Sequence, residues 1–364
     1  MYDKVMMNRT LSIIIPTYNM AELLPRCLDS IIAAGVGEDI EAIVVNDGSK
    51  DNSLQIARDY EKTHPECITV IDKPNGNYGS TINAALPVAK GKYVKILDSD
   101  DWFDSNALKN FVRGLQTVEA DVVVTHFNII HHNGRAEHAK YNVYGREPYE
   151  YGEVYDLDYV LGGGHIRFFV MHALTYRTEL LRRTGYRQSE GVSYTDTQWC
   201  AYPLFHASDI IFFDITLYQY NLAREGQTMD PKVIARSLDQ LCRMDFDMFD
   251  FYTAFDKSKL SSERLVFFRQ YFLNRARLLA KTYLYDIPRD LFDTKEFEKV
   301  DAKIKEFVKD NELGRIRLMP ENKILPIDFY SYWQARHKRP SKMLEGINHL
   351  TDIVVKWIYV KIFR

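Results

Sequence analysis

The sequence predicts an α/β fold, with a mostly parallel sheet flanked by helices and a helical domain at its C-terminal end. Two patterns lead to this prediction. From residue 11 to about residue 126, short runs rich in β-branched residues alternate with amphipathic stretches, as in the βαβ units that build a parallel sheet. After residue 230, apolar residues recur every three or four positions over long stretches, which is typical of helices.

The chain has 364 residues, which exceeds one average domain. We therefore expect a first domain over residues 1–228 and a helical domain over residues 229–364. Five apolar runs in the first domain are the expected strands: residues 11–15, 41–45, 68–71, 93–97 and 121–125. Because these runs are apolar at consecutive positions, we expect strands that are covered on both faces.

Composition and charge argue against several classes of protein. A formal net charge of -3 argues against nucleic-acid binding driven by whole-molecule charge. The four cysteines contain no CxxC pair, which fits neither a zinc site nor a disulfide framework and favours a reducing compartment. Residues 1–10 lack the apolar core of a signal peptide, and no run reaches the roughly 18 apolar residues of a membrane-spanning helix. We expect a cytoplasmic protein.

Polar segments follow the first two expected strands, at the edge of a parallel sheet where ligands bind. The first segment is Pro16-Thr17-Tyr18-Asn19. A strand-to-helix turn explains it when it is taken alone, although Tyr18 could stack against a base. The second segment is residues 46–51, in which the Asp47 carboxylate could accept a hydrogen bond from a base. An Asx turn before a helix capped by Asp51 or Ser53 explains that segment equally well.

A glycine-rich segment, residues 73–79, follows the third strand and leads into a helix that we expect to begin near Ser80 and to carry Asn83. Its two glycines allow a close backbone approach, and a helix N-terminus favours anions. The segment matches neither GxxxxGKS nor GxGxxG, so a phosphate site and a structural loop are equally compatible with it.

Three carboxylates, those of Asp98, Asp100 and Asp101, follow the strand at residues 93–97. They repel one another and are costly to bury unless a cation or hydrogen-bond donors neutralise them. A solvated acidic turn is the alternative. Because ligands bind at this edge of a sheet and hard oxygen ligands suit Mg²⁺ or Mn²⁺, we favour a metal ion that bridges phosphates.

Together these segments resemble glycosyltransferase family 2 of the GT-A fold, over about residues 10–228. The family's P-x-Y-N opening corresponds to residues 16–19, and its N/D-D-G-S-x-D segment corresponds to residues 46–51. Its glycine-rich segment, which ends in a helical asparagine, corresponds to residues 75–83, and its DxD motif to residues 98–101. Four matches in the family's order are highly specific.

The resemblance implies a Rossmann-like sheet with a nucleotide-binding half at about residues 10–126 and an acceptor-side half at about residues 127–228. It implies that Asp47 binds the base, that Asp98 lies on the ribose or sugar side, and that Asp100 holds Mg²⁺ or Mn²⁺ on the diphosphate. The residues that it assigns to nucleotide binding are Pro16, Tyr18, Asn19, Asp47, Lys73, Gly79, Asn83 and Asp98.

The family places its catalytic base in a Glu-Asp-like pair at the start of a later helix. In this chain the corresponding region is residues 193–199, so Asp196 is the implied general base and Thr195 stands in the place of the glutamate. Residues 224–228 loosely resemble a later family segment near the phosphates, which makes Arg224 a candidate phosphate contact.

The function implied by the resemblance is inverting transfer of a sugar from a nucleotide diphosphate donor to an acceptor hydroxyl. The acceptor would be a saccharide or a lipid-linked molecule in polysaccharide or glycolipid synthesis, because comparable bacterial enzymes build surface polysaccharides. UDP is the favoured nucleotide, since the family uses it most often. Asp196 would take the hydroxyl proton, and a divalent cation would stabilise the departing diphosphate.

The tail at residues 336–364 is basic and has apolar residues along one helical side, so it could lie on an anionic membrane surface. A helix packed on the protein is the alternative. The scattered histidines His165, His172 and His206 are assigned no chemistry, and His131-His132 is expected at a hairpin tip.

Two other classes of protein share features with this sequence. A nucleotidyltransferase would usually carry a glycine-rich loop with basic residues after its first strand, where this chain has residues 16–19. A non-catalytic GT-A-like module, which binds a sugar nucleotide or serves as a partner subunit, is the main alternative to an enzyme.

Overall fold

The computed structural model describes residues 9–140, 148–222, 231–318 and 328–344. Contacts divide the chain into two compact units. The first comprises residues 1–225 and 258–267, and the second comprises residues 226–257 and 268–364. The domain division expected after residue 228 stays a prediction, because a division by contacts does not test which segments fold alone.

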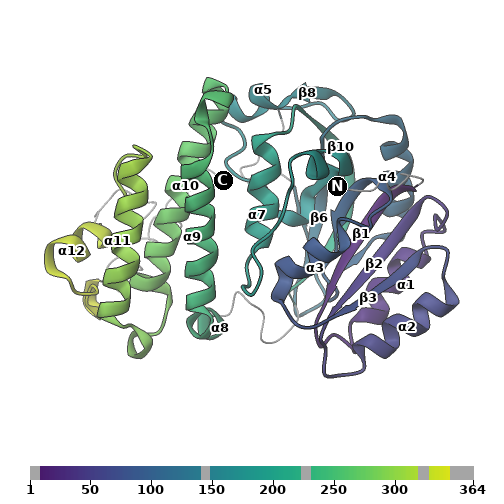
Figure 1. Ribbon diagram of the computed structural model, residues 1–364, viewed down its shortest axis with the longest axis horizontal. Coiled ribbons are helices and arrows are strands. Elements are labelled where there is room, and N and C mark those ends of the chain that lie inside the picture. The colour runs from purple at the N-terminus through teal and green to yellow at the C-terminus, as the bar shows by residue number, and fades with distance from the viewer. Residues whose placement is uncertain (1–8, 141–147, 223–230, 319–327, 345–364) are drawn as a thin grey trace. The chain divides into compact units, whose positions relative to one another are not determined.

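One ten-stranded sheet forms the centre of the first unit, in the order β3-β2-β1-β4-β9-β6-β10-β5, with β7 beside β6 and β8 beside β10. Figure 1 shows β1, β2 and β3 side by side in this sheet. The first four strands in this order are parallel: β1 (Arg9–Thr17), β2 (Ile40–Asp47), β3 (Ile68–Lys73) and β4 (Gly91–Ile96). Ile13, Ile14 and Ile15 are all 0% exposed. Because neighbouring side chains point to opposite faces of a strand, both faces of β1 are covered, as its apolar run predicts.

The rest of the sheet is mixed. β9 (Leu174–Arg177) runs antiparallel between β4 and β6 (Val122–Ile130), and β10 (Asp209–Asn221) is parallel to β6. The short strands β5 (Trp102–Phe103), β7 (Ala136–Ala139) and β8 (Val154–Asp156) pair antiparallel with their neighbours. The predicted sheet with flanking helices is confirmed. The five expected strands correspond to β1, β2, β3, β4 and β6, whereas β5, β7, β8, β9 and β10 are not among them. His131 and His132 lie in the turn between β6 and β7, as expected.

Seven α-helices and two 3₁₀ turns are described between the strands of the first unit. They are α1 (Leu24–Ile32), α2 (Ser53–Thr63), α3 (Asn77–Ala85), α4 (Ser105–Thr117), α5 (Leu157–Gly162), η1 (Met171–Ala173), α6 (Thr178–Arg183), α7 (Asp196–Ala201) and η2 (Tyr202–Phe205). The sequence favours either Asp104 or Ser105 as the cap of α4. Asp104 is the cap, because its side chain accepts a hydrogen bond from the Ala107 N–H at 2.8 Å.

Two expected helix starts were wrong. The residue that precedes α2 is Asn52, whereas Asp51 or Ser53 was expected as the cap. Asp51 instead accepts hydrogen bonds from the N–H and hydroxyl groups of Ser53 at 3.0 and 2.6 Å, and so forms the turn before the helix. α3 begins at Asn77, earlier than Ser80, because Asn77 adopts a φ of 62° and turns the chain directly into the helix.

The described part of the second unit is helical, as predicted. Its elements are α8 (Pro231–Arg236), α9 (Leu238–Ala254), α10 (Ser262–Lys281) from residue 268 onward, α11 (Thr294–Asp310) and α12 (Phe329–Arg336), with short turns at Thr282–Asp286 and Arg289–Leu291. The start of α10 and most of the turn at Lys257–Lys259 belong to the first unit. Stacked aromatic rings fill the core: Phe249 lies on Phe307 with centroids 4.0 Å apart, and Tyr252 lies on Phe272 with centroids 4.4 Å apart. Most of the predicted basic tail, from residue 345 onward, lies outside the described residues.

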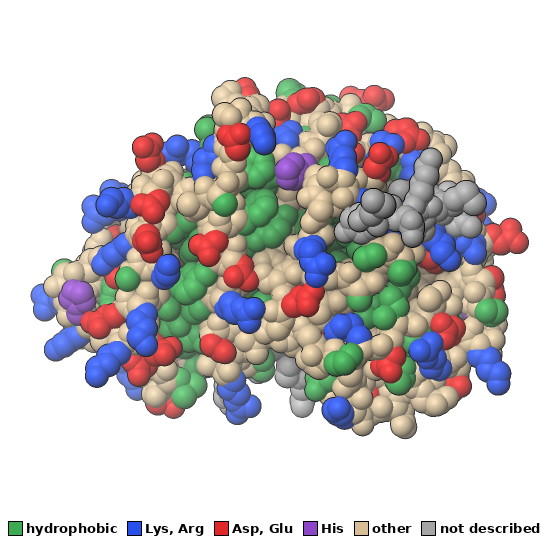
Figure 2. All heavy atoms as spheres, in the orientation of Figure 1, with side chains coloured by type: hydrophobic (Ala, Val, Ile, Leu, Met, Phe, Trp, Pro, Cys, Tyr) green, Lys and Arg blue, Asp and Glu red, His purple; other side chains and the backbone are tan. Residues whose placement is uncertain are grey.

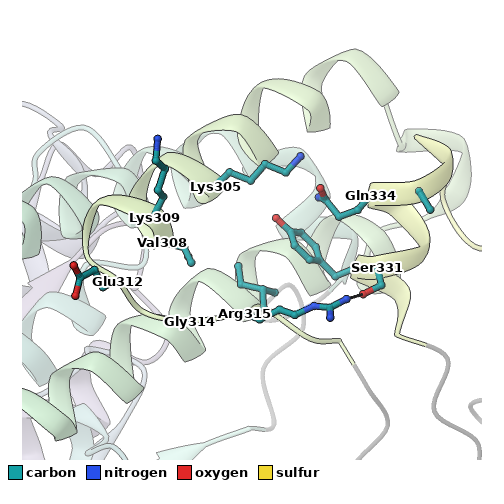
Figure 3. Close-up of a pocket in the computed structure, with 11 residues that line it drawn as sticks. Lys305, Val308, Lys309, Glu312, Gly314, Arg315, Ser331 and Gln334 are labelled. Atoms are coloured by element: carbon teal, nitrogen blue, oxygen red, sulfur yellow. Dashed lines mark hydrogen bonds between the residues drawn. The ribbon is translucent and has the colours of Figure 1, made fainter.

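A cavity of about 760 Å³ lies in the second unit and is lined by α11, α12 and the chain between them (Figure 3). Three cationic side chains, those of Lys305, Lys309 and Arg315, contribute to its lining. Lys305 forms an ion pair with Asp301 at 2.8 Å, and Arg315 donates to the Ser331 hydroxyl at 2.9 Å. This lining contains none of the residues predicted for the functional site.

Charges of both signs occur together on one face of the molecule. On the face in Figure 2, Lys and Arg side chains are interspersed with Asp and Glu side chains over the described residues. This mixture agrees with the formal net charge of -3. Within the described ranges, no helix has both the length and the apolar character needed to cross a membrane.

Candidate active site

The polar segments that follow β1, β2 and β4 meet at one edge of the sheet. Because these strands are parallel, their carboxyl ends lie together, and the register places Asp47 beside Lys73. Residues 16–19, 46–51 and 98–101 are therefore brought to the edge where open α/β sheets bind ligands.

Asn19 joins the loop after β1 to the loop after β2. Its backbone N–H donates to the Ser49 hydroxyl at 3.0 Å, and its Oδ1 accepts from the Lys50 N–H at 2.7 Å. Asn19 adopts a φ of 53°, which asparagine tolerates better than most residues. The neighbouring Tyr18 ring is 46% exposed and therefore accessible to a ligand. The predicted nucleotide contacts of both residues stay predictions.

Asp47 is almost fully buried at the end of β2 and holds the glycine-rich segment in place. Its Oδ1 accepts from Lys73 Nζ at 2.6 Å and from the Gly76 N–H at 2.9 Å. Lys73 Nζ also donates to the Pro74 carbonyl at 2.6 Å and to the Ser80 hydroxyl at 2.8 Å. The two residues predicted to bind nucleotide thus form an internal ion pair that orders this loop.

Gly79 and Asn83, both on α3, contact the loop between α6 and α7. A Cβ atom on Gly79 would lie 2.1 Å from the carbonyl oxygen of Ser189, so only glycine fits without a shift of the backbone. Asn83 Oδ1 accepts from the Gln188 N–H at 2.9 Å, and its Nδ2 donates to the Gln188 carbonyl at 2.8 Å. These contacts give both residues a packing role beside the nucleotide role that was predicted.

Asp101 differs from the other two carboxylates of the acidic turn. It is 2% exposed, and it accepts hydrogen bonds from the Tyr218 hydroxyl at 2.6 Å and from the Asn221 N–H at 2.7 Å. Burial, followed by the charges of Asp100 and Asp98, raises its pKa well above the ordinary value. Asp101 therefore bonds β10 to the acidic turn, whereas Asp98 and Asp100 are only half-buried.

Tyr78 on α3 lies at the centre of the carboxylates and was not predicted. Its hydroxyl donates to Asp98 Oδ1 at 2.7 Å. Burial, followed by the charges of Asp98, Asp196 and Asp100, raises its pKa well above the ordinary value. Burial, followed by the charges of Asp101, Asp98, Asp100 and Asp196, raises the pKa of Tyr220 to about 12. The structure thus brings the acidic turn and Asp196 around two tyrosines. An aromatic residue on a helix carries no sequence signal that separates such a role from packing.

Asp196 is the first residue of α7 and is exposed, and the buried Thr195 precedes it. The expected position at a helix start is confirmed, and the role as base stays a prediction. Pro16 contacts the acidic turn, because its carbonyl accepts a hydrogen bond from the Ser99 hydroxyl at 2.8 Å. Arg224, the candidate phosphate contact, lies outside the described residues.

One group among the described residues has the ligands and spacing to hold a metal ion. Ligand atoms of Asp98, Asp101 and His172 lie within 4.8 Å of one another. Within the described ranges, the buried Nδ1 of His172 has no hydrogen-bond partner. Burial, followed by the charge of Lys95, lowers the pKa of His172 to about 3, which keeps the imidazole in its metal-binding neutral form. Asp100, the predicted ligand, is not in this group.

Residues 12–185 match the sequence pattern of a known family, glycosyl transferase family 2. These residues belong to that family. The matched range includes all four motif segments of the donor side. Asp196 and Arg224 lie beyond it, so their roles do not follow from the family match.

Curated relatives match parts of this chain at moderate identity. An uncharacterised glycosyltransferase of Mycoplasma pneumoniae is 42% identical over 101 residues, which is 27% of this chain and 33% of the relative. Chondroitin synthase of Pasteurella multocida is 41% identical over 106 residues, 28% of this chain and 11% of the synthase. Poly(ribitol-phosphate) beta-glucosyltransferase of Bacillus spizizenii is 37% identical over 117 residues, 31% of this chain and 18% of that enzyme. The matched segment spans about a third or less of each relative.

One solved structure, with a TM-score above 0.5, shows the same fold. The mannosyltransferase PcManGT from Pyrobaculum calidifontis, in complex with GDP-Man and Mn²⁺, has a TM-score of 0.51 at 18% identity, over 83% of this chain and 86% of that chain. S. aureus TarS in complex with UDP-GlcNAc has a TM-score of 0.48 at 20% identity, over 83% and 90% of the two chains. The prediction of a GT-A fold for this family 2 domain is confirmed.

Proposed function

We propose that this protein is an inverting glycosyltransferase that moves a sugar from a nucleotide diphosphate donor to an acceptor hydroxyl. The observation that carries the proposal is the placement of Asp98 and Asp100, which lie in the family 2 segment, together with Asp196 around Tyr78. Such a cluster offers carboxylates for a metal-bound diphosphate and a separate carboxylate for a proton at one reaction centre.

Asp196 is the general base in this proposal. The acceptor oxygen forms a bond to C1 of the sugar while the bond from C1 to the donor phosphate oxygen breaks, and that electron pair leaves with the nucleoside diphosphate. The hydroxyl proton passes to the Asp196 carboxylate. Attack from the face opposite to the leaving group inverts C1. The exposure of Asp196 supports this role, because an acceptor must reach it.

The donor nucleotide, for which UDP is favoured, binds at the carboxyl ends of β1 and β2. The exposed Tyr18 ring offers a face for the base, and Asp47 is a carboxylate at the end of β2. The other residues proposed for the nucleotide are Pro16, Asn19, Lys73, Gly79 and Asp98, with Arg224 on the phosphates.

The residues at the acidic turn fit a divalent cation, Mg²⁺ or Mn²⁺. Asp100 would hold it, as the resemblance implies. The Asp98 carboxylate and the buried His172 Nδ1, which has no hydrogen-bond partner among the described residues, lie close enough together to add an oxygen and a nitrogen ligand. When bound, the cation supplies Lewis-acid stabilisation of the charge on the diphosphate. Tyr78 orients Asp98 through its hydrogen bond of 2.7 Å.

The acceptor in this proposal is a saccharide or a lipid-linked saccharide of a surface polymer. Two relatives support this class by their names, chondroitin synthase and poly(ribitol-phosphate) beta-glucosyltransferase. Residues 127–228 form the acceptor side, and the basic tail at residues 336–364 contacts the cytoplasmic face of an anionic membrane, where a lipid-linked acceptor would lie.

The test is release of nucleoside diphosphate from UDP-glucose, UDP-GlcNAc and GDP-mannose, with Mn²⁺ or Mg²⁺ and with EDTA. We expect one donor to be turned over in a metal-dependent reaction, and both Asp100→Ala and Asp196→Ala to slow it by about 10³-fold. The exposed Asp59 on α2 supplies the control, Asp59→Ala, which should leave turnover unchanged. Donor binding without any turnover would instead establish a non-catalytic sugar-nucleotide-binding module.

A further inference from the structure

The loop at residues 186–191, between α6 and α7, is bonded to α3 through Asn83. The Asn83 amide forms a pair of hydrogen bonds with the backbone of Gln188, at 2.9 Å to its N–H and 2.8 Å to its carbonyl. Asn83 Nδ2 also donates to Glu190 Oε1 at 2.8 Å. The Asn83 amide thus both accepts a hydrogen bond from this loop and donates hydrogen bonds to it.

Gly76 gives the 186–191 loop a second bond to the donor side. Its carbonyl accepts from the Gly191 N–H at 2.8 Å, while its N–H donates to Asp47 Oδ1 at 2.9 Å. Gly79 adds a close backbone contact with Ser189. Asp47, which is predicted to bind the base, is therefore connected to the 186–191 loop through Gly76.

Gln198 bonds the same loop to α7. Its Oε1 accepts from the Ser189 N–H at 2.8 Å, and its Nε2 donates to the Ser189 hydroxyl at 2.8 Å. Gln198 is 0% exposed and lies two residues after Asp196, in the same turn of helix. Because α7 has only six residues, it has few backbone hydrogen bonds of its own, and its position depends on tertiary contacts.

We propose that Asn83 and Gln198 are positioning residues that fix Asp196 relative to the donor side through the 186–191 loop. The inference rests on the proposed function of Asp196 as the base. Asn83 then acts on proton transfer and does not contact the nucleotide, although it is the asparagine of the glycine-rich motif. A displacement of a catalytic group by about 1 Å can cost about 100-fold in rate.

Kinetics separate this role from a nucleotide contact. For Asn83→Ala and Gln198→Ala we expect kcat to fall by about 10- to 100-fold, while the Kd for UDP, measured by calorimetry with Mn²⁺, changes by less than about 3-fold. The exposed amides Asn110 and Gln55 supply matched controls, Asn110→Ala and Gln55→Ala, which should retain the wild-type kcat. A UDP Kd raised about 10-fold with kcat unchanged would overturn the proposal in favour of nucleotide binding.

A double-mutant cycle tests whether Asn83 acts through Asp196. In the Asp196→Ala background, Asn83→Ala should cause no further loss of residual donor hydrolysis, because the group that it positions is absent. Losses that multiply in the double variant would overturn the proposal. A purely structural role would lower Tm and leave kcat at wild-type values well below Tm, which would overturn it as well.

The same data distinguish failure of the inference from failure of the proposed function. If the wild type turns over none of the donors, the proposed function fails and the positioning role fails with it. If the wild type is active and Asp196→Ala is not, while Asn83→Ala and Gln198→Ala keep the wild-type kcat, only the positioning role fails.

Discussion

The glycine-rich segment at residues 73–83 and the acidic turn at residues 98–101 lie at the same edge of the sheet, and both have the composition of a ligand site. Their surroundings differ. In the glycine-rich segment, Lys73 and Asn83 form hydrogen bonds and an ion pair within the protein. Among the three carboxylates of the acidic turn, only Asp101 is buried, with two hydrogen-bond donors, and burial, followed by the charges of Asp100 and Asp98, raises its pKa. Motif residues bonded internally build the site, whereas the acidic turn gathers like charges that a bound cation would offset.

The largest expected effect is on the acidic turn. Asp100→Ala should reduce kcat by about 10³-fold and leave Tm unchanged or slightly raised, because the substitution removes repulsion from the buried Asp101. Turnover and thermal unfolding of the same preparation check this. A fall in Tm that parallels the loss of activity would contradict the assignment of this turn to a ligand.

The second prediction concerns the glycine-rich segment. Gly79→Ala should lower the free energy of unfolding by about 1 to 3 kcal/mol, because the new Cβ would lie 2.1 Å from a backbone oxygen. Gly37→Ala is the control, since its Cβ would meet its nearest neighbour at an ordinary 3.5 Å. Urea unfolding measures both. If Gly79→Ala kept full stability but lost UDP binding, the contrast between the two segments would be wrong.

Much of the donor side could be predicted from sequence, for a physical reason. Parallel strands carry the segments that follow them to one edge, so the local patterns ending at Asp47 and at Asp98 determine where those residues lie. The Asp104 cap is also a local feature.

The other features depend on contacts that no local pattern encodes. The loop that binds Asn83 lies 105 residues later in the chain, at Gln188. The place of His172 beside Asp98 depends on the unpredicted strand β9, which follows η1 directly. Tyr78 gains its hydrogen bond to Asp98 only when α3 packs against the strands.

The third prediction concerns the protonation state of the buried Lys95, which decides whether this lysine offsets the negative charge of the acidic turn. Lys95 on β4 is 0% exposed, donates to the carbonyls of His172 and Leu174 at 2.8 and 3.1 Å, and has its pKa lowered by burial to about 7. An unfolded chain keeps this proton up to about pH 10.4, so between those values the unfolded state binds more protons and stability rises with pH. Below about pH 7 the cost of the buried charge is present in full.

A comparison of the wild type with Lys95→Met isolates the part of the pH dependence of stability that Lys95 causes. From about pH 7 to about pH 9, the wild type should gain about 2 kcal/mol of stability relative to the variant, measured by urea unfolding at several pH values. Parallel pH profiles would mean that Lys95 stays charged, as it would if the carboxylates of the acidic turn paired with it.

The smallest expected effect concerns Tyr78. Tyr78→Phe removes the hydrogen bond to Asp98 and should lower kcat by about 10-fold, equivalent to about 1.4 kcal/mol. Tyr60→Phe is the matched control, because it removes a tyrosine–aspartate bond of the same 2.7 Å length, to Asp29, away from the site. Equal kcat values for the two variants would contradict a contribution of Tyr78 to the reaction.

The most direct test of the account is single-turnover chemistry of Asp196→Asn with the preferred donor and Mn²⁺. We expect donor Kd within about 3-fold of the wild type and a rate of sugar transfer or donor hydrolysis lower by about 10³-fold, because an amide cannot take the acceptor proton. A rate within about 10-fold of the wild type, with the donor bound, would contradict the role of Asp196 as the base.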